Sequence, residues 1–261
     1  MGRVVSAAET APTTYASEIR AVGLRVRAGR RMAVNELDLS LGIGVHGILG
    51  PNGAGKTTLI RCLATVLRPS GGSVELLGRK PGGTDLRPIR REIGYLPQQF
   101  GFYSRFTVRE FVEYMAWLKE MPKAEIPEAV QRAIDRADLT SRADDKLKTL
   151  SGGMVRRAGI AQALVNNPRI LLLDEPTVGL DPAQRMQFRE LLRSLSSDTC
   201  VVVSTHLVED VANACTDVVL MREGRLVFQG TPETLAAAGS ESEAGDSPLE
   251  RGYSALLGRA S

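Results

Sequence analysis

The residues with the most specific chemistry form a glycine-rich turn. The turn matches the pattern G-x-x-x-x-G-K-[ST] with Gly50, Pro51, Asn52, Gly53, Ala54, Gly55, Lys56 and Thr57. Residues 45–49 before it predict a short strand, and residues 56–67 after it predict a helix. Glycines let successive backbone N–H groups point at one centre, and a helix N-terminus adds partial positive charge. The turn therefore predicts a nucleotide phosphate site, where Lys56 contacts the β- and γ-phosphates, Thr57 binds Mg²⁺ and Thr58 contacts the α-phosphate.

Two acidic residues follow an apolar run. Residues 170–173 are typical of a fully buried parallel strand, and Asp174 and Glu175 come directly after them. Ligands of open α/β sheets bind at the carboxyl ends of such strands. There Asp174 would hold Mg²⁺ through water, and Glu175 would accept a proton from an attacking water molecule. A strand followed by an acidic turn explains the pair equally well on its own, but the phosphate-binding turn favours the metal and base roles.

A third motif is Leu150-Ser-Gly-Gly-Met154. Ser is a strong helix N-cap, so the segment alone also suits an ordinary helix start. In combination, the order of motifs resembles that of the ATP-binding-cassette (ABC) ATPases. These motifs are the phosphate-binding turn, Gln98, Leu150–Met154, Asp174–Glu175, Gly179–Asp181 and His206. The resemblance covers about residues 19–235.

The resemblance implies roles for individual residues, with ATP and Mg²⁺ as cofactors. Gln98 is expected to contact Mg²⁺ and the lytic water, and to sense a membrane partner. The motif residues Ser151, Gly152 and Gly153 are expected to bind the γ-phosphate of ATP held by another subunit, because a helix N-terminus presents free N–H groups to an anion. Asp181 would cross the dimer interface. His206 would hold the γ-phosphate and orient Glu175.

The expected fold class is α/β. The resemblance implies a P-loop NTPase core with a parallel sheet flanked by helices, an N-terminal antiparallel β-subdomain and an inserted α-helical subdomain. The expected organisation is a flexible tail at 1–17, a nucleotide-binding domain at 18–235 with its helical subdomain at about 100–165, and a linker with a short C-terminal helix at 236–261.

Residue patterns predict further elements. Alternating apolar residues predict antiparallel strands between residues 17 and 41, and a hairpin around Glu223-Gly224. A strand is expected at 71–76 and a second buried parallel strand at 200–204. Helical patterns cover 108–119 and 125–137, and a helix is expected to begin at Ser151. A low-complexity linker is expected at 236–248, followed by a helix at 249–257.

A closer resemblance is to the drug-resistance and multidrug exporter ATPases. It depends on Met154 followed by Val-Arg-Arg, on Phe106-Thr-Val-Arg-Glu110, and on the C-terminal segment. It implies two partners: a separate polytopic membrane permease, and a second nucleotide-binding subunit that is a copy of this chain or a paralogue. The implied location is peripheral, on the cytoplasmic face of the cell membrane. The transported substrate stays open, and the direction of transport depends on the resemblance alone.

Aromatic residues are scarce but gather after Gln98. They are Phe100, Phe102, Tyr103 and Phe106. Such a cluster either packs inside the helical subdomain or forms an exposed groove for a short helix of the permease.

The sequence departs from the family pattern at the residue expected to contact adenine. Many family members place an aromatic residue about 28 positions before the phosphate-binding lysine, where this chain has Ala28. The stacking contact is therefore either missing or replaced by Val26 or Val34.

Composition limits the alternatives. The 33 basic and 30 acidic residues give a net charge of +3 without an obvious cluster, so nucleic acid is not an expected partner. No stretch approaches 18 consecutive apolar residues, which excludes a membrane-spanning helix from the expectations. A GTPase would carry N/T-K-x-D, and none of the six lysines lies in that pattern. A soluble cassette ATPase of an assembly system, such as iron–sulfur cluster scaffolding, remains an alternative because its motifs would be identical.

Overall fold

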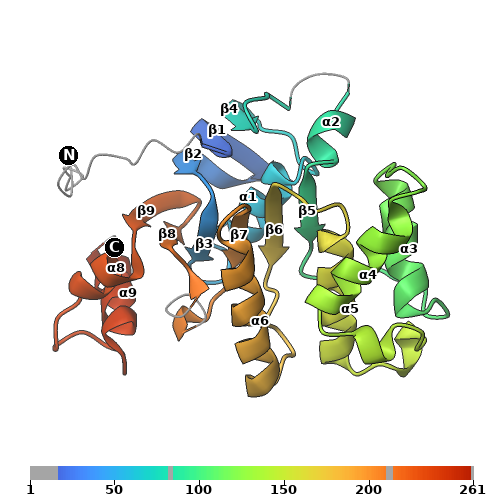
Figure 1. Cartoon of the computed structure of the whole chain (residues 1–261). Helices are drawn as coiled ribbons and strands as arrows, with labels where there is room; N and C mark the ends of the chain where they lie inside the picture. Colours follow the sequence, from blue (N-terminus) through green and yellow to red (C-terminus); the bar gives the residue numbers. More distant parts are fainter. Residues whose placement is uncertain (1–16, 82–84, 210–213, 260–261) are drawn as a thin grey trace.

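A six-stranded sheet carries the residues of interest at one edge. The computed structural model describes residues 17–81, 85–209 and 214–259 (Figure 1). The strand order is β5-β6-β7-β3-β8-β9, with all neighbours parallel except the last pair. The bounds are β3 Gly44–Leu49, β5 Ile93–Leu96, β6 Ile170–Asp174, β7 Cys200–Ser204, β8 Asp217–Arg222 and β9 Arg225–Gly230. The parallel strands therefore end at a common edge, and ligands of open α/β sheets bind outside the carboxyl ends of such strands.

A second, antiparallel sheet covers one face of the first. It contains β1 Ile19–Ala28, β2 Arg31–Leu41 and β4 Gly71–Leu76 in the order β2-β1-β4. Helix α1, Lys56–Leu63, packs between the two sheets, and its residues share one apolar cluster with β1 and β2 (Figure 1). Strand β6 is buried along its whole length, and its successive side chains point to opposite faces of the sheet. Ile170 and Leu172 join the cluster on the α1 side, whereas Leu171 and Leu173 face the helices on the other side.

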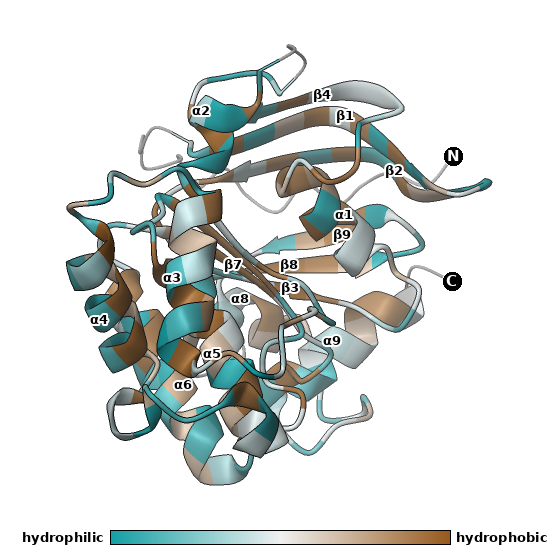
Figure 2. Ribbon diagram, turned by 90° about the vertical axis from the view of Figure 1, so that its right-hand side faces the viewer, coloured by the Kyte–Doolittle hydropathy of each residue, from teal (hydrophilic) through white to brown (hydrophobic). Residues whose placement is uncertain are grey.

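Those helices form the inserted part of the chain, which extends to one side of the sheet (Figure 1). They are α3 Val108–Leu118, α4 Ile126–Arg136 and α5 Gly152–Leu164, with short turns of helix at Arg87–Arg90 (α2), Thr140–Arg142 and Leu147–Thr149. Helix α3 begins with a capping box, in which Thr107 and Glu110 bond each other's backbone N–H groups. Figure 2 shows hydrophobic stretches along the sides of α3 and α4 and along the central strands. The predicted α/β class, with an antiparallel N-terminal sheet and a helical insert, is confirmed.

The predicted end of the helix after the glycine-rich turn is wrong. Helix α1 was expected to reach residue 67 but ends at Leu63. Thr65 has φ +59°, its N–H donates to Cys62 O, and the Val66 N–H donates to Arg61 O. This pair of hydrogen bonds is the Schellman arrangement that normally has glycine in the left-handed position. Because threonine occupies that position here, the sequence lacked the usual stop signal.

Within the described ranges, six elements were not predicted from the sequence. They are α2, β5, the short helical turns at Thr140–Arg142 and Leu147–Thr149, α6 (Pro182–Leu195) and α8 (Pro232–Ala237). Helix α6 has strong start signals, because Asp181 and Gln184 form a capping box and Pro182 occupies the first turn. Helix α8 ends at Ala237, so the linker predicted from residue 236 begins slightly later. The tail predicted at 1–17 lies outside the described residues except for Ser17.

The C-terminal helices close the far edge of the main sheet. Helix α9, Pro248–Arg259, contains the helix predicted at 249–257. It lies beside α8 in Figure 1, and Leu235, Leu249, Val218 and Leu220 share a third apolar cluster. Gly252 allows the two helices to approach closely, since a Cβ there would collide with the carbonyl oxygen of Leu235.

We therefore expect Gly252→Ala to separate α9 from α8. The added methyl group has no free space, and overpacking of this kind costs about 1–3 kcal/mol. The melting temperature should fall, and trypsin should cut the C-terminal segment sooner. Gly258→Ala is the matched control in the same helix, because a Cβ at Gly258 meets nothing within 4 Å. Equal melting temperatures and cleavage rates for the two variants would contradict this account of the contact.

Candidate nucleotide-hydrolysis site

The glycine-rich turn connects β3 to α1 and leaves the first N–H groups of α1 available. Gly55 is the N-cap, with φ +104° and no side-chain hydrogen bond to the helix. Its backbone also passes so close to Ala33 O that a Cβ would collide with that oxygen. A larger residue is therefore excluded for two reasons, conformation and space. The uncapped helix start forms the kind of anion site that the sequence predicted.

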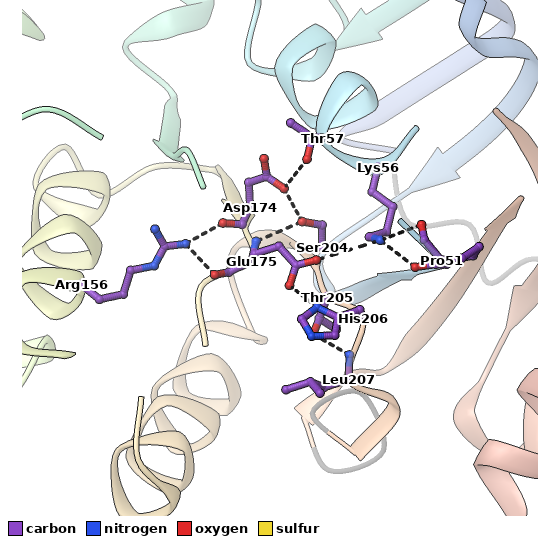
Figure 3. A network of polar contacts seen from close by, with 11 residues as sticks. Pro51, Lys56, Thr57, Arg156, Asp174, Glu175, Ser204, Thr205, His206 and Leu207 are labelled. Atoms are coloured by element: carbon purple, nitrogen blue, oxygen red, sulfur yellow. Dashed lines mark hydrogen bonds and ion pairs between the residues drawn. The ribbon is translucent and has the colours of Figure 1, made fainter. Parts of the chain in front are cut away.

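Lys56 is buried at the start of α1. Its Nζ donates to Gly50 O at 2.6 Å and to Pro51 O at 3.3 Å, and lies 4.0 Å from Glu175 Oε1. Burial lowers the pKa of Lys56, while the negative charges of Glu175 and Asp174 act in the opposite direction. The ammonium group is thus held between the loop carbonyls and the carboxylates (Figure 3).

Asp174 ends β6 and is 1% exposed. Its Oδ1 accepts hydrogen bonds from Thr57 Oγ1 at 3.1 Å and from Ser204 Oγ at 2.5 Å. Its Oδ2 is buried and has no hydrogen-bond partner among the described residues. A buried carboxylate oxygen without a donor is costly unless a cation or water occupies the neighbouring space. With the Thr57 hydroxyl beside it, this oxygen-only donor set fits Mg²⁺.

Glu175 turns away from the strand direction. It has φ +49°, a left-handed backbone conformation that is uncommon for a residue with a Cβ. Its N–H donates to Ser204 O and is 3.1 Å from Ser204 Oγ. Its Oε2 is 2.8 Å from His206 Nδ1, and its Oε1 faces Lys56. The turn therefore aims Asp174 toward Thr57 and Glu175 toward His206, as Figure 3 shows.

A cavity of about 320 Å³ lies beside the turn. Its lining comprises Ala28, Arg31, Ala33, Asn52, Gly53, Ala54, Gly55, Lys56, Thr57, Thr58, Gln98 and Glu175. The structure thus brings the phosphate-binding turn, Gln98 and Glu175 around one space. Ser151, Gly152 and Gly153 are not among the described residues that line it.

Ser151–Gly153 instead form the start of α5. Ser151 is the N-cap, and its Oγ accepts from Met154 N at 3.3 Å. Gly153 packs against Gln184, so a Cβ at this position would meet the Gln184 side chain. Asp181 caps α6 by accepting from Gln184 N at 2.8 Å. This local role of Asp181 was not predicted, and its proposed place across a dimer interface is untested by a single chain.

Three residues near the site were not recognised in the sequence. Ser204 joins Asp174 to the Glu175 N–H, Arg156 donates to backbone carbonyls around the carboxylates, and Arg31 lines the cavity next to Ala28. The alternative in which Val26 or Val34 replaces an aromatic residue at the base is wrong. Both valines are 0% exposed and pack in the cluster between the sheets, so neither can contact a nucleotide.

The aromatic cluster after Gln98 divides into an inner and an outer part. Phe100 packs against Gly159 of α5, and Phe106 joins the same apolar core. Tyr103 is 59% exposed, and its ring lies tilted against Phe106 and edge-on to Tyr114, with centroids 5.0 and 5.9 Å away. Trp117, 62% exposed, continues this surface beside Tyr114. The packing alternative therefore holds for Phe100 and Phe106, and Tyr103 is exposed as the other alternative requires; binding of a permease helix stays a prediction.

Fold and site together define a P-loop nucleotide hydrolase. Residues 34–178, more than half of the chain, match the profile of the ABC transporter family. The chain therefore belongs to the ABC transporter family, and it is an ATPase cassette of that family.

Related proteins support the assignment to the ABC transporter family. The chain is 38% identical over 230 residues to the Nod factor export ATP-binding protein I of Burkholderia orbicola, covering 86% of this chain and 73% of that protein. It is 38% identical over 188 residues to YxlF of Bacillus subtilis, an uncharacterized ABC transporter ATP-binding protein, covering 72% of this chain and 62% of YxlF. It is 37% identical to the probable multidrug ABC transporter ATP-binding protein YbhF of Escherichia coli, covering 78% of this chain but 35% of YbhF. The chain thus spans less than two thirds of two of these relatives.

Solved structures give the same fold. The dimeric structure of a bacterial ABC transporter cassette matches with a TM-score of 0.73 and 28% identity, covering 82% of this chain and 98% of that one. A post-hydrolysis state of that cassette, bound to ADP and phosphate, matches with a TM-score of 0.73 and 27% identity over the same shares. The relatives named above are ATP-binding proteins of transporters, which does not favour the iron–sulfur assembly alternative.

Proposed function

We propose that this chain hydrolyses ATP in the cavity beside Lys56 and couples that reaction to export of a substrate by a separate membrane permease. The observation that supports the hydrolysis role is the grouping of Lys56, Thr57, Gln98 and Glu175 around one cavity. Export is supported by the relatives that are named for Nod factor export and multidrug transport. The substrate of this chain stays open.

Glu175 is the proposed general base. Phosphoryl transfer depends mainly on positioning and charge stabilisation, and one carboxylate must orient and deprotonate the attacking water. His206 Nδ1 fixes one carboxylate oxygen of Glu175 at 2.8 Å. Lys56 faces the other oxygen and supplies positive charge where the phosphates would lie. When ATP enters, its phosphates would replace the carbonyls of Gly50 and Pro51 as partners of Lys56.

Mg²⁺ is the proposed metal cofactor. The Thr57 hydroxyl and Asp174 Oδ2 would hold it, the latter directly or through water, with Gln98 at the edge of the same cavity. When bound, the metal would neutralise charge on the phosphates. The protein contributes fixed oxygen donors, because Ser204 Oγ holds the other Asp174 oxygen in place.

A second cassette, a copy of this chain or a paralogue, is proposed to complete the site. Ser151 and Gly152 are exposed at the start of α5 and take no part in the chain's own cavity. Their helix start would bind the γ-phosphate of ATP on the other subunit, because its N–H groups favour an anion. The dimeric cassette among the similar structures supports this arrangement.

We expect Glu175→Gln to bind ATP with unchanged affinity and to lower kcat by about a hundredfold or more, because the amide cannot accept the proton. ATP should then accumulate a closed dimer on size-exclusion chromatography. Glu223→Gln is a suitable control, because Glu223 lies in the β8–β9 turn with its side chain 79% exposed. Turnover of Glu175→Gln near the wild-type rate would overturn the assignment of the base.

The permease is proposed to bind the exposed aromatic surface on α3. A groove of about 510 Å³ lies there, lined by Phe106, Glu110, Glu113, Tyr114, Trp117, Lys123, Ile126 and Pro127. Exposed aromatic residues are enriched at interfaces, and the two glutamates on α3 would favour a basic residue on the partner. A short permease helix with an apolar face and a basic residue fits this groove. The cassette would then lie on the cytoplasmic face of the membrane as a peripheral protein; no helix in the described ranges is long and apolar enough to cross it.

Tyr103→Ala combined with Trp117→Ala should reduce recovery of the permease about tenfold when tagged protein is purified from solubilised membranes. The ATPase rate of the isolated chain should stay within about twofold, because neither residue lines the nucleotide cavity. Val22→Ala, at a residue 50% exposed on β1, is the control for loss of an exposed apolar side chain. Recovery of soluble proteins alone with the wild-type chain, or equal permease recovery with both variants, would contradict the proposal.

Arg31 is the proposed contact for the base of ATP. It is exposed, lines the cavity next to Ala28, and its Nη1 lies 4.0 Å from the position that a Cβ would take at Gly53. A guanidinium plane stacks on aromatic rings and would serve where the side chain of Ala28 is too small.

Arg31→Ala should weaken ATP binding about two- to fivefold, the range of an exposed cation–π contact, and leave tripolyphosphate binding unchanged. Isothermal titration with both ligands measures this. Arg30→Ala is the control in the same β1–β2 turn. Equal weakening for ATP and tripolyphosphate would show that Arg31 contacts phosphate, contrary to the proposal.

A further inference from the structure

Arg156 is a buried charged residue on α5, which we call the signature helix because it begins at the signature motif, Leu150-Ser-Gly-Gly-Met154. It is 7% exposed. Burial lowers the pKa of its guanidinium, and the negative charges of Asp174 and Glu175 act in the opposite direction. Arginine still keeps its charge in proteins. A buried charge is costly unless its donors are satisfied, so its partners decide what it does here.

Within the part of the chain that the structure describes, those partners are all backbone carbonyls. Arg156 Nη2 donates to Asp174 O at 2.6 Å and to Glu175 O at 2.7 Å, and Nε donates to Pro176 O at 3.2 Å. Nη1 donates at 3.0 Å to both Pro97 O and Gln98 O. All five N–H donors of the guanidinium are therefore used. Two neighbouring strand ends, after β5 and after β6, are joined by one side chain.

Three consecutive carbonyls can reach one guanidinium only because the chain turns at Glu175. The left-handed conformation there, φ +49°, carries a steric cost for a residue with a Cβ. Ser204 holds the N–H side of the Glu175 peptide and Arg156 holds the carbonyl side, as Figure 3 shows. The direction of the Glu175 carboxylate, toward His206 and Lys56, depends on this turn.

Arg156 also belongs to the helix that begins with the signature. Ser151 caps α5, and Arg156 follows about one and a half turns later. Gln98, whose carbonyl Arg156 binds, lines the nucleotide cavity together with Glu175. A displacement of α5 would therefore move or break the hydrogen bonds by which Arg156 holds the backbone carbonyls of Gln98 and Glu175.

We propose that Arg156 is a positioning residue for hydrolysis: it maintains the left-handed turn that aims Glu175, and it couples the position of the signature helix to Glu175 and Gln98. The proposal rests on the proposed role of Glu175 as the base. It assigns Arg156 no contact with ATP, since Arg156 is not among the described residues that line the cavity.

The test uses Arg156→Gln and Arg156→Lys in the full chain, with Arg157→Lys as control. Arg157 is the next residue of α5 but pairs with Asp138 away from the carboxylates. Arg156→Gln should lower kcat about a hundredfold, the cost of misplacing a catalytic group, and change the KM for ATP less than about twofold. Arg156→Lys, which keeps the charge but has three donors, should give an intermediate kcat. Arg157→Lys should match the wild type.

A double-mutant cycle separates positioning from general support of the fold. In the Glu175→Gln background, single-turnover measurements should show that Arg156→Gln costs less than about threefold further, because residues acting through one group are non-additive. The same loss in both backgrounds, or a loss explained by the folded fraction in circular dichroism, would overturn the proposal. If Arg156→Gln fails to fold, the cycle is run with Arg156→Lys, and wild-type kcat in that variant would also overturn it. Wild-type turnover of Glu175→Gln would instead refute the base.

Discussion

The left-handed peptide at the end of β6 is the constraint on which the site depends. Two adjacent carboxylates must serve different partners within a few ångströms. A continued strand would place them on opposite faces of the sheet, where only one could face the nucleotide. The turn at Glu175 sends both to the carboxyl edge, Asp174 toward Thr57 and Glu175 toward His206. The neighbouring strands support the turn, because β7 supplies Ser204 and the segment after β5 supplies carbonyls to Arg156.

Charge balance follows from the same geometry. Lys56 and Arg156 are both buried cations, and Asp174 and Glu175 are the buried anions beside them. Lys56 faces the side-chain carboxylate of Glu175, whereas Arg156 donates to the backbone carbonyls of Asp174 and Glu175. Burial of these four groups strengthens their interactions relative to bulk solvent. The site can therefore accept phosphates and a divalent cation with little rearrangement of the carboxylates.

The sequence predicted the parts of this site whose chemistry is local. The phosphate-binding turn and the Asp174–Glu175 pair are continuous segments, so their residue types and spacing were sufficient. Ser204 and Arg156 were both missed, and for Arg156 the reason is physical. Arg156 binds backbone carbonyls 18 to 59 residues away in the chain, and a carbonyl leaves no trace in residue identity. The same holds for the end of α1, where Thr65 adopts a conformation that glycine usually marks. Helix α6 was missed although Asp181 and Gln184 form a capping box, because Asp181 was interpreted only as an interface residue.

The phosphate half and the proposed base half of the nucleotide cavity contain different kinds of residues, and this difference affects which nucleotides can bind. The phosphate half consists of backbone N–H groups and Lys56, fixed by the packing of α1 between two sheets, and of the buried carboxylates at the end of β6. The base half contains Ala28 and Arg31, which are exposed, while the apolar residues nearby, Val26 and Val34, are committed to the core. The exposed guanidinium of Arg31, the proposed base contact, can stack on any base, since every base has a π face. With that contact, we expect this chain to select for the triphosphate more than for adenine, so that other purine triphosphates should compete with ATP within a narrow range of affinity.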